Sequence, residues 1–177
     1  MSGHNKWSKI KNRKAVTDSQ KSKIFGKYAR LIAIESKRVG GDVSSPSLSA
    51  VIDRAKAENM PNDNIERAVK KGAGGDTGNL ETIVYETYGP GGCAILISAL
   101  TDNRNRAAQE IKHALVENGF ELAAPGSASW AFQKTHDGYD ATMPLALSED
   151  DKNKLQKLVD ELDELDDVQD IYTNVSE

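Results

Sequence analysis

Apolar residues in the first half of the chain recur at the three- to four-residue spacing of helices that bury one face. The first such segment begins at Thr17, which forms a capping box with Gln20. It ends at Gly40-Gly41, because glycine readily takes the left-handed conformation that closes a helix. Its apolar side chains project within about a 120° sector and comprise Ile24, Phe25, Tyr28, Leu31 and Ile32.

Two shorter helices are predicted to follow the first. Ser45-Pro46 is typical of an N-cap and a first helical residue, and Met60-Pro61 separates this second helix from a third. The third is predicted to end with Lys70-Lys71, a basic end that suits the helix dipole, and residues 72–75 are interpreted as a hinge. The pattern predicts a three-helix domain over residues 17–75.

Beyond Glu81 the apolar residues follow the two-residue period of strands. Residues 82–88 and 93–100 are predicted strands joined by a glycine-rich turn. The further predicted elements are a helix that contains residues 107–115 and ends at Gly119, a strand over 127–134, a short strand within 139–145, a helix capped by Ser148 with Asp151, and a strand over 168–173. This order predicts a ferredoxin-like α/β sandwich over residues 76–177, with both helices on one face of the sheet, and an α+β protein as a whole.

Composition is that of an ordinary globular protein, with 38% hydrophobic and 28% charged residues among 177. No apolar stretch approaches the roughly 18 residues of a membrane helix. The start of the chain lacks the apolar region of a secretory signal. A mitochondrial transit peptide stays an alternative, because residues 1–17 contain no acid, although their excess of lysine over arginine weakens it. The single cysteine, Cys93, excludes an internal disulfide and suits a reducing compartment.

The net charge of −4 conceals two oppositely charged halves. Residues 1–75 contain 16 Lys and Arg against 7 Asp and Glu, a balance of +9. Residues 76–177 contain 7 against 20, a balance of −13. The basic half is therefore expected to bind a polyanion. The alternative, that the halves neutralise each other, fits less well because the basic residues gather in the first 30 positions.

The basic residues of the first half form two groups. Residues 1–16 are too polar to fold alone and are expected to form a flexible tail that contacts phosphates through its cations. Trp7 would either stack on an unpaired base or anchor the tail to the helical domain, and both alternatives stay open. On the first helix, basic side chains project away from the apolar face. The predicted contacts of both groups are Lys6, Trp7, Lys9, Lys11, Arg13, Lys14, Lys23, Lys27 and Arg30.

A second phosphate contact is predicted at the start of the helix after the second strand. Arg104 and Arg106 follow an Asp-Asn pair that is suited to an N-cap. Cations beside the free N–H groups of a helix start form an anion pocket. The alternative is that the two arginines pair with acidic neighbours such as Glu81, Glu86 or Glu110.

No enzymatic constellation is visible in the sequence. The three histidines are scattered without a second ligand at metal-site spacing, and Cys93 is interpreted as a packed thiol. The acidic cluster around residues 163–167 is interpreted as a solvated face. The glycine turns match neither phosphate-loop pattern. The sequence therefore predicts a protein without catalytic residues, cofactor or metal.

Several motifs in one register resemble the YebC/PmpR family. They run in order over nearly the whole chain and comprise Gly3-His4-Asn5-Lys6-Trp7-Ser8-Lys9-Ile10-Lys11, Asn59-Met60-Pro61, Ile65-Glu66-Arg67-Ala68, Lys71-Gly72-Ala73-Gly74-Gly75, Tyr88-Gly89-Pro90-Gly91-Gly92, residues 101–106 and residues 165–174. The resemblance implies a cytoplasmic bacterial protein without enzymatic activity. It also implies a helical domain followed by two α/β domains, the third inserted in the second.

The sequence departs from that family pattern near residues 135–138. A four-residue turn, Thr135-His136-Asp137-Gly138, stands where family members carry their third domain. The third domain is therefore predicted to be missing.

Two functions follow from the resemblance. The first is a transcriptional regulator that binds DNA, and the alternative is a ribosome-associated translation factor that binds rRNA or tRNA and relieves stalling. A protein partner for the acidic C-terminal domain is compatible with either. A basic tail without a recognition helix would suit structured RNA at least as well as DNA.

Overall fold

The computed structural model describes residues 17–136 and 138–176, so the predicted basic tail, residues 1–16, lies outside the described residues. The chain divides into two compact units, one ending at Glu81 and the other resuming at Thr82. We call the described part of the first the helical unit (residues 17–81) and that of the second the sheet unit (residues 82–136 and 138–176). The elements in chain order are α1 (Asp18–Arg38), α2 (Pro46–Ala57), α3 (Asn62–Ala73), β1 (Glu81–Tyr88), η2 (Pro90–Gly92), β2 (Ala94–Thr101), α4 (Arg104–Glu117), β3 (Leu122–Ala123), η3 (Ser129–Ala131), β4 (Phe132–Thr135), β5 (Gly138–Ala141), α5 (Glu149–Asp163) and β6 (Val168–Thr173).

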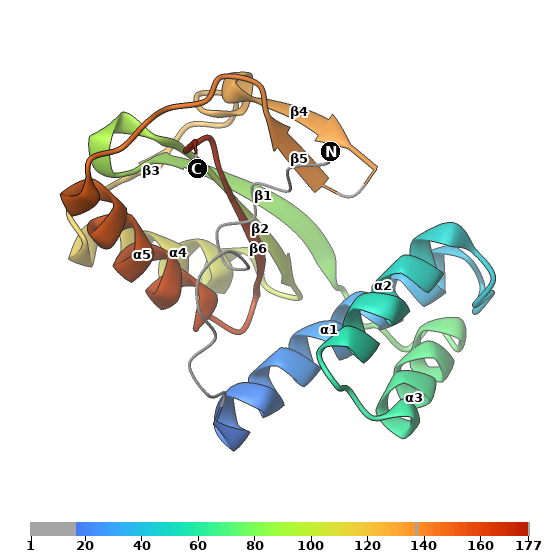
Figure 1. The fold of residues 1–177 in the computed structure, drawn as a ribbon. Coiled ribbons are helices and arrows are strands. Elements are labelled where there is room, and N and C mark those ends of the chain that lie inside the picture. Colours follow the sequence, from blue (N-terminus) through green and yellow to red (C-terminus); the bar gives the residue numbers. More distant parts are fainter. Residues whose placement is uncertain (1–16, 137, 177) are drawn as a thin grey trace. The chain divides into compact units, whose positions relative to one another are not determined.

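The predicted class is confirmed: an α+β chain in which three helices precede an antiparallel sheet with two further helices (Figure 1). The beginning of α1 follows the sequence pattern in detail. The Thr17 backbone N–H donates to Gln20 Oε1 at 2.9 Å, and the Gln20 N–H donates to Thr17 Oγ1 at 3.4 Å. This reciprocal pair is the predicted capping box, which satisfies N–H groups that the first turn leaves without a helical partner.

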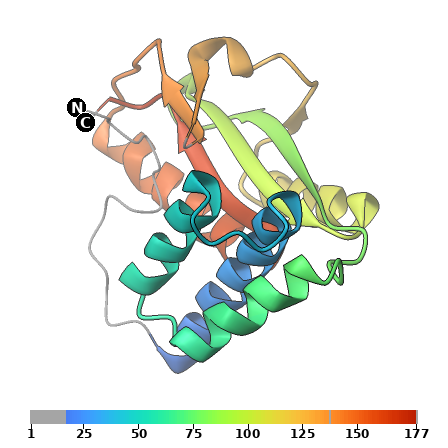
Figure 2. The same ribbon diagram turned by 90° about the vertical axis from the view of Figure 1, so that its right-hand side faces the viewer.

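The three helices of the helical unit, whose backbones are drawn in Figure 2, enclose one apolar core. Its buried residues come from all three helices and include Ile32 of α1, Leu48 of α2 and Ile65 of α3. Gly40, in the left-handed conformation with φ 62°, closes α1 as predicted. The Gly41 N–H then donates to the Ser36 carbonyl at 2.9 Å, the long-range bond of a Schellman motif.

Helix α3 continues through Gly72, so the prediction that it ends with Lys70-Lys71 was wrong. A Cβ at Gly72 would overlap the Ala33 carbonyl oxygen and lie 2.7 Å from Ser36 Cβ. The glycine is therefore a contact point that lets α3 approach the backbone of α1. The buried Ser36 hydroxyl stabilises this close contact between the two helices by donating to the Val69 carbonyl at 2.6 Å.

The sheet unit has a four-stranded sheet in the order β3-β1-β2-β6. Strands β2 and β3 lie on either side of β1 and are joined through α4, which is the split βαβ arrangement. One face of β2 contributes Ile95 and Ile97 to a core shared with α4 and α5. The opposite face contributes Ala94 and Leu96 to a smaller core against η3 and the β4–β5 hairpin. Figure 1 shows both helices on one face, as predicted, and the hairpin on the other.

The third strand is where sequence and structure disagree. Residues 127–134 were expected to extend the sheet, but they form the 3-10 helix η3 and then β4, which pairs with β5 in a separate two-stranded sheet. The edge position beside β1 is taken by β3, whose two residues pair with Glu86 and Thr87. A two-residue strand is too short to show alternation, so periodicity alone misses it.

Candidate functional site

Eleven residues were predicted to contact nucleic acid, and six of them lie outside the described residues. These six are Lys6, Trp7, Lys9, Lys11, Arg13 and Lys14, and their role stays a prediction. The other five lie at the surface in two places: Lys23, Lys27 and Arg30 on α1, and Arg104 and Arg106 in the first turn of α4.

The three cations on α1 follow one side of the helix, because they are spaced four and three residues apart. Lys23 is exposed, whereas Lys27 and Arg30 are half-buried. Arg30 also lines a groove that opens between α1 and α3, so it connects the predicted basic stripe with this groove.

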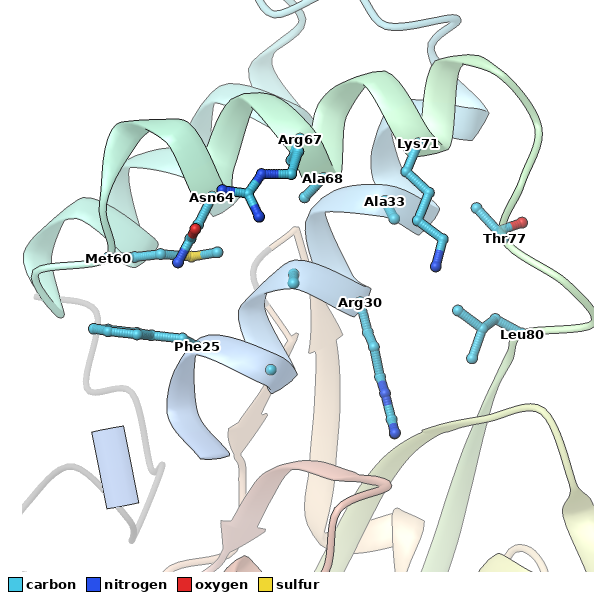
Figure 3. A pocket seen from close by; sticks show the side chains of 12 residues that line it. Phe25, Arg30, Ala33, Met60, Asn64, Arg67, Ala68, Lys71, Thr77 and Leu80 are labelled. Carbon is cyan, nitrogen blue, oxygen red and sulfur yellow. The ribbon is translucent and has the colours of Figure 1, made fainter. Parts of the chain in front are cut away.

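The groove has a volume of about 530 Å³ and lies wholly within the helical unit. Figure 3 shows Phe25 and Met60 towards one end and Lys71, Thr77 and Leu80 towards the other. Most of the remaining wall consists of small apolar residues. The lining comprises Phe25, Gly26, Ala29, Arg30, Ala33, Met60, Asn64, Arg67, Ala68, Lys71, Thr77 and Leu80.

The motif Asn59-Met60-Pro61 builds one end of the groove. Asn59 takes the left-handed conformation with φ 63°, which asparagine tolerates better than most residues. The Met60 N–H donates to the Ala55 carbonyl at 3.0 Å, and the Asn59 N–H donates to the Lys56 carbonyl at 2.9 Å. These two bonds close α2 as a Schellman motif. Met60 is thereby fixed in the tight turn, and Pro61 is the N-cap of α3.

The charged residues of the groove are all cations. Arg30 comes from α1, Arg67 and Lys71 come from α3, and the lining contains no aspartate or glutamate. Arg67 and Lys71 are exposed, and neither side chain forms an ion pair or a hydrogen bond with another described residue. The groove thus combines an apolar floor with positive charge, which suits an anionic ligand that has an apolar part.

Sequence reasoning placed Arg30 at the interface but missed Arg67 and Lys71. Both stand in motifs that supported the family resemblance, and they are four residues apart on one helix, so they share a side of it. That spacing was the available signal. What the sequence could not show is that α3 turns this side towards Arg30, because the approach depends on the tertiary contact at Gly72.

Arg106 is held by two carboxylates in the sheet unit. Its Nη2 lies 2.7 Å from Asp102 Oδ1 and 2.9 Å from Oδ2 of the buried Asp167. Hydrogen bonds from Arg106 to Asp167 first, and then to Asp102, raise the pKa of the guanidinium above its usual value. This geometry agrees with the alternative of pairing to acidic neighbours, although the partners are not the glutamates that were named.

The Asp167 carboxylate connects two of the family motifs, residues 101–106 and residues 165–174. The Thr101 hydroxyl lies 2.9 Å from Asp167 Oδ2, and the Asn103 side chain caps α4 by accepting the Arg106 N–H at 3.0 Å. Arg106 thus has a structural role at the start of α4. Arg104 is exposed beside it, and its contact with phosphate stays a prediction.

The remaining candidates for chemistry are the Cys93 thiol and groups of side chains that could bind a metal ion. Cys93 is completely buried, and this burial raises the pKa of its thiol to about 11. Over residues 17–136 and 138–176, no three His, Cys, Asp or Glu side chains are grouped so that they could hold a metal ion. Within the same ranges, no helix is both long and apolar enough to cross a membrane.

The helical unit and the sheet unit both match models of a known family. The model of the TACO1/YebC protein N-terminal domain matches residues 5–75. The model of the TACO1/YebC second and third domain matches residues 80–139 and 135–175. Because these matches cover most of the sequence, the chain belongs to the TACO1/YebC family.

Curated relatives and a solved structure agree with this assignment. A protein of Finegoldia magna is 53% identical over 136 residues, which are 76% of this chain and 56% of that protein. A protein of Thermotoga maritima is 50% identical over 136 residues, 76% of this chain and 54% of that protein. Both are named "Probable transcriptional regulatory protein". The chain therefore spans about half the length of the curated relatives it matches.

The crystal structure of a conserved hypothetical protein from Aquifex aeolicus superposes with a TM-score of 0.82 at 28% sequence identity. The match covers 96% of this chain and 96% of that one. The fold described above is thus also found in an experimental structure.

Proposed function

We propose that this chain is a non-enzymatic regulatory protein that binds nucleic acid through its basic N-terminal half, with DNA as the target and transcription as the regulated process. The observation that carries the proposal is the groove between α1 and α3, whose charged residues are three cations without an acid. The names of the curated relatives support the regulatory role. Cytoplasmic location without a cofactor belongs to the same proposal.

The charge distribution supports a polyanionic partner for the helical half. Residues 1–75 carry a balance of +9, and the exposed lysines and arginines of α1 and α3 are part of it. Cations on a protein release counterions when they meet phosphates, which gives affinity without sequence preference. Base contacts or DNA deformation would have to supply the specificity of a regulator.

We further propose that the chain lacks the third domain of longer family members. The family model for the second and third domains matches in two segments that meet at residues 135–139. The β4–β5 hairpin occupies that place, with Thr135 and Gly138 as cross-strand partners. Any family activity that needs the third domain would then be absent from this chain.

A gel-shift selection with fragments of bacterial genomic DNA tests the DNA target. The full chain is expected to retain a subset of fragments when unlabelled non-specific DNA is present in large excess. Sedimentation of cell extract through a sucrose gradient provides the control. Loss of every complex to the competitor, together with co-migration of the chain with a ribosomal subunit, would contradict the DNA proposal and favour a ribosomal role.

A further inference from the structure

We propose that the groove between α1 and α3 binds one unpaired nucleotide of a single-stranded nucleic acid, with the base on the apolar floor and the neighbouring phosphates on the cations. This inference rests on the proposed function, because it names how the helical unit would contact the nucleic acid. The proposed function needs only a basic surface on the helical unit. The inference adds that a pocket in this unit takes up an unpaired base.

The size and floor of the groove fit a base. Its volume of about 530 Å³ lies within the roughly 300–1,000 Å³ typical of ligand pockets. Phe25 is half-buried and supplies an aromatic surface, and Met60 supplies a polarisable thioether beside it (Figure 3). Every base has a π-face, so stacking on such a surface is tolerant of sequence.

One polar side chain in the groove is suited to the edge of a base. Asn64 is half-buried, and its side-chain amide has no hydrogen-bond partner among the described residues. The amide offers both donors and an acceptor. An unpaired base exposes complementary groups on its Watson–Crick edge, which would satisfy this amide when the base enters.

The cations are placed to hold the backbone on either side of the base. Arg67 lies one helical turn before Lys71 on α3, and Arg30 comes from α1. No aspartate or glutamate is among the described residues that line the groove, so the charged groups of the lining are all positive. A base inside a duplex would have to leave its stack to reach the apolar floor, which costs a few kcal/mol. A single strand avoids that cost.

Gly26 allows the groove to be filled without the removal of any contact. This exposed residue of α1 lines the groove, and a Cβ built on it meets no atom within 4 Å. Gly26→Leu should therefore fold, and it also replaces a poor helix former by a good one. The leucine would occupy the space of the base while every cation remains.

The test uses fluorescence anisotropy to measure binding of the full chain to single-stranded nucleic acids of 12 nucleotides and to the matched duplex. Identical sequences as DNA and as RNA identify the source of the nucleotide, and a central 2-aminopurine reports stacking in the DNA strand. We expect Gly26→Leu to weaken single-strand binding about 10-fold, within the range expected for loss of one stacked base. Duplex binding should change less than twofold, and the 2-aminopurine quenching should disappear.

A second variant tests the phosphate contacts independently. Arg67→Gln with Lys71→Gln removes two exposed charges whose side chains form no ion pair or hydrogen bond with another described residue. The matched control is Lys56→Gln with Lys70→Gln, which removes the same charge from exposed positions outside the groove. We expect the groove pair to lower the slope of log affinity against log salt for single strands by about 1.4, and the control pair to lower it much less.

The outcomes separate the two proposals. Unchanged single-strand affinity and retained quenching in Gly26→Leu would overturn the groove proposal, as would equal effects of the two glutamine pairs. Binding of the wild-type chain to duplex DNA would still support the proposed function in that case. If the wild-type chain binds none of the single strands or duplexes, the proposed function itself fails.

Discussion

Gly72 of α3 and Gly26 of α1 differ in what a side chain would meet at their positions. Gly72 is buried where α3 meets α1, and its missing Cβ leaves room for the Ala33 carbonyl. Gly26 is exposed and faces open space beside the groove. The sequence presents both as glycines inside or near a helical pattern. Only the tertiary contact distinguishes the one that permits packing from the one that leaves a groove open.

Gly72→Ala is expected to destabilise the protein by about 1–3 kcal/mol, the usual cost of forcing an extra carbon into a packed contact. The reason is that the new Cβ meets backbone atoms of α1, which cannot rotate away. Gly26→Ala is the matched control and should stabilise it by about 0.5–1 kcal/mol, because alanine restricts the unfolded chain. Urea denaturation measures both, and a Gly72→Ala variant as stable as wild type would show that the helices separate easily.

At the scale of elements, the positions of most helices and strands could be predicted because their boundaries are chemical. Thr17 and Ser148 mark the starts of α1 and α5 through local hydrogen bonds. Gly119 marks the end of α4 through its left-handed backbone conformation.

The end of α3 was missed although it is local, because Gly75 takes the left-handed conformation and the Asp76 N–H donates to the Lys71 carbonyl. The pairing of β3 was missed because it depends on residues distant in sequence. The groove escaped prediction for the same reason, although Arg67 and Lys71 both stand in family motifs.

The loop that leads into η3 shows such a long-range dependence most clearly. The carboxylate of Glu86 on β1 is 8% exposed and accepts the N–H groups of Gly126, Ala128 and Ser129 at 2.7–2.8 Å. Burial by itself raises the pKa of this carboxyl, but the three backbone N–H groups outweigh it and hold the pKa below its usual value. Glu86 therefore fixes residues 126–129 against the sheet.

Glu86→Gln is expected to lower the free energy of unfolding at pH 7 by about 1–3 kcal/mol, because a neutral amide satisfies three donors less well. The folded-state pKa is depressed, so the stabilisation is present above the unfolded-state pKa near 4.5 and disappears as the pH falls through the folded value. The difference between wild type and variant should thus narrow as the pH falls below about 4.5 and close only once the pH is below the depressed folded-state pKa. Denaturation at a series of pH values measures this, with Glu121→Gln at an exposed position as control. A gap that persists at low pH would contradict the ionic role.

For the whole molecule, the division of charge follows the division into units. Residues 1–16 and the helical unit contain the basic excess, and the sheet unit carries an excess of acids. A polyanion is attracted to one half of the chain and repelled by the other. Which half is basic and which is acidic could be predicted from the sequence alone, because the charge balance of each half depends only on the order of residues. The structure adds that the cations of α1 and α3 meet at a groove.

Replacing Lys9, Lys11, Arg13 and Lys14 by alanine is expected to weaken duplex binding and to reduce the salt slope by up to about 3.6, or about 0.9 for each phosphate that is no longer neutralised. The control replaces four exposed lysines of the sheet unit, which changes the net charge equally: Lys112, Lys134, Lys154 and Lys157. It should leave the slope nearly unchanged. Affinities measured from about 50 to 200 mM salt, the range over which phosphate binding weakens steeply, decide between them, and equal slopes for both variants would show that net charge alone matters.

The pairing of Thr135 with Gly138 at the tip of the β4–β5 hairpin has a practical consequence. Cross-strand partners in an antiparallel ladder lie about 5 Å apart, so a guest domain spliced between them needs only adjacent ends of its own. Its presence would leave the ladder behind it intact. The hairpin tip is therefore the place to graft a fluorescent reporter or an affinity handle, far along the chain from the groove whose binding it would be used to follow.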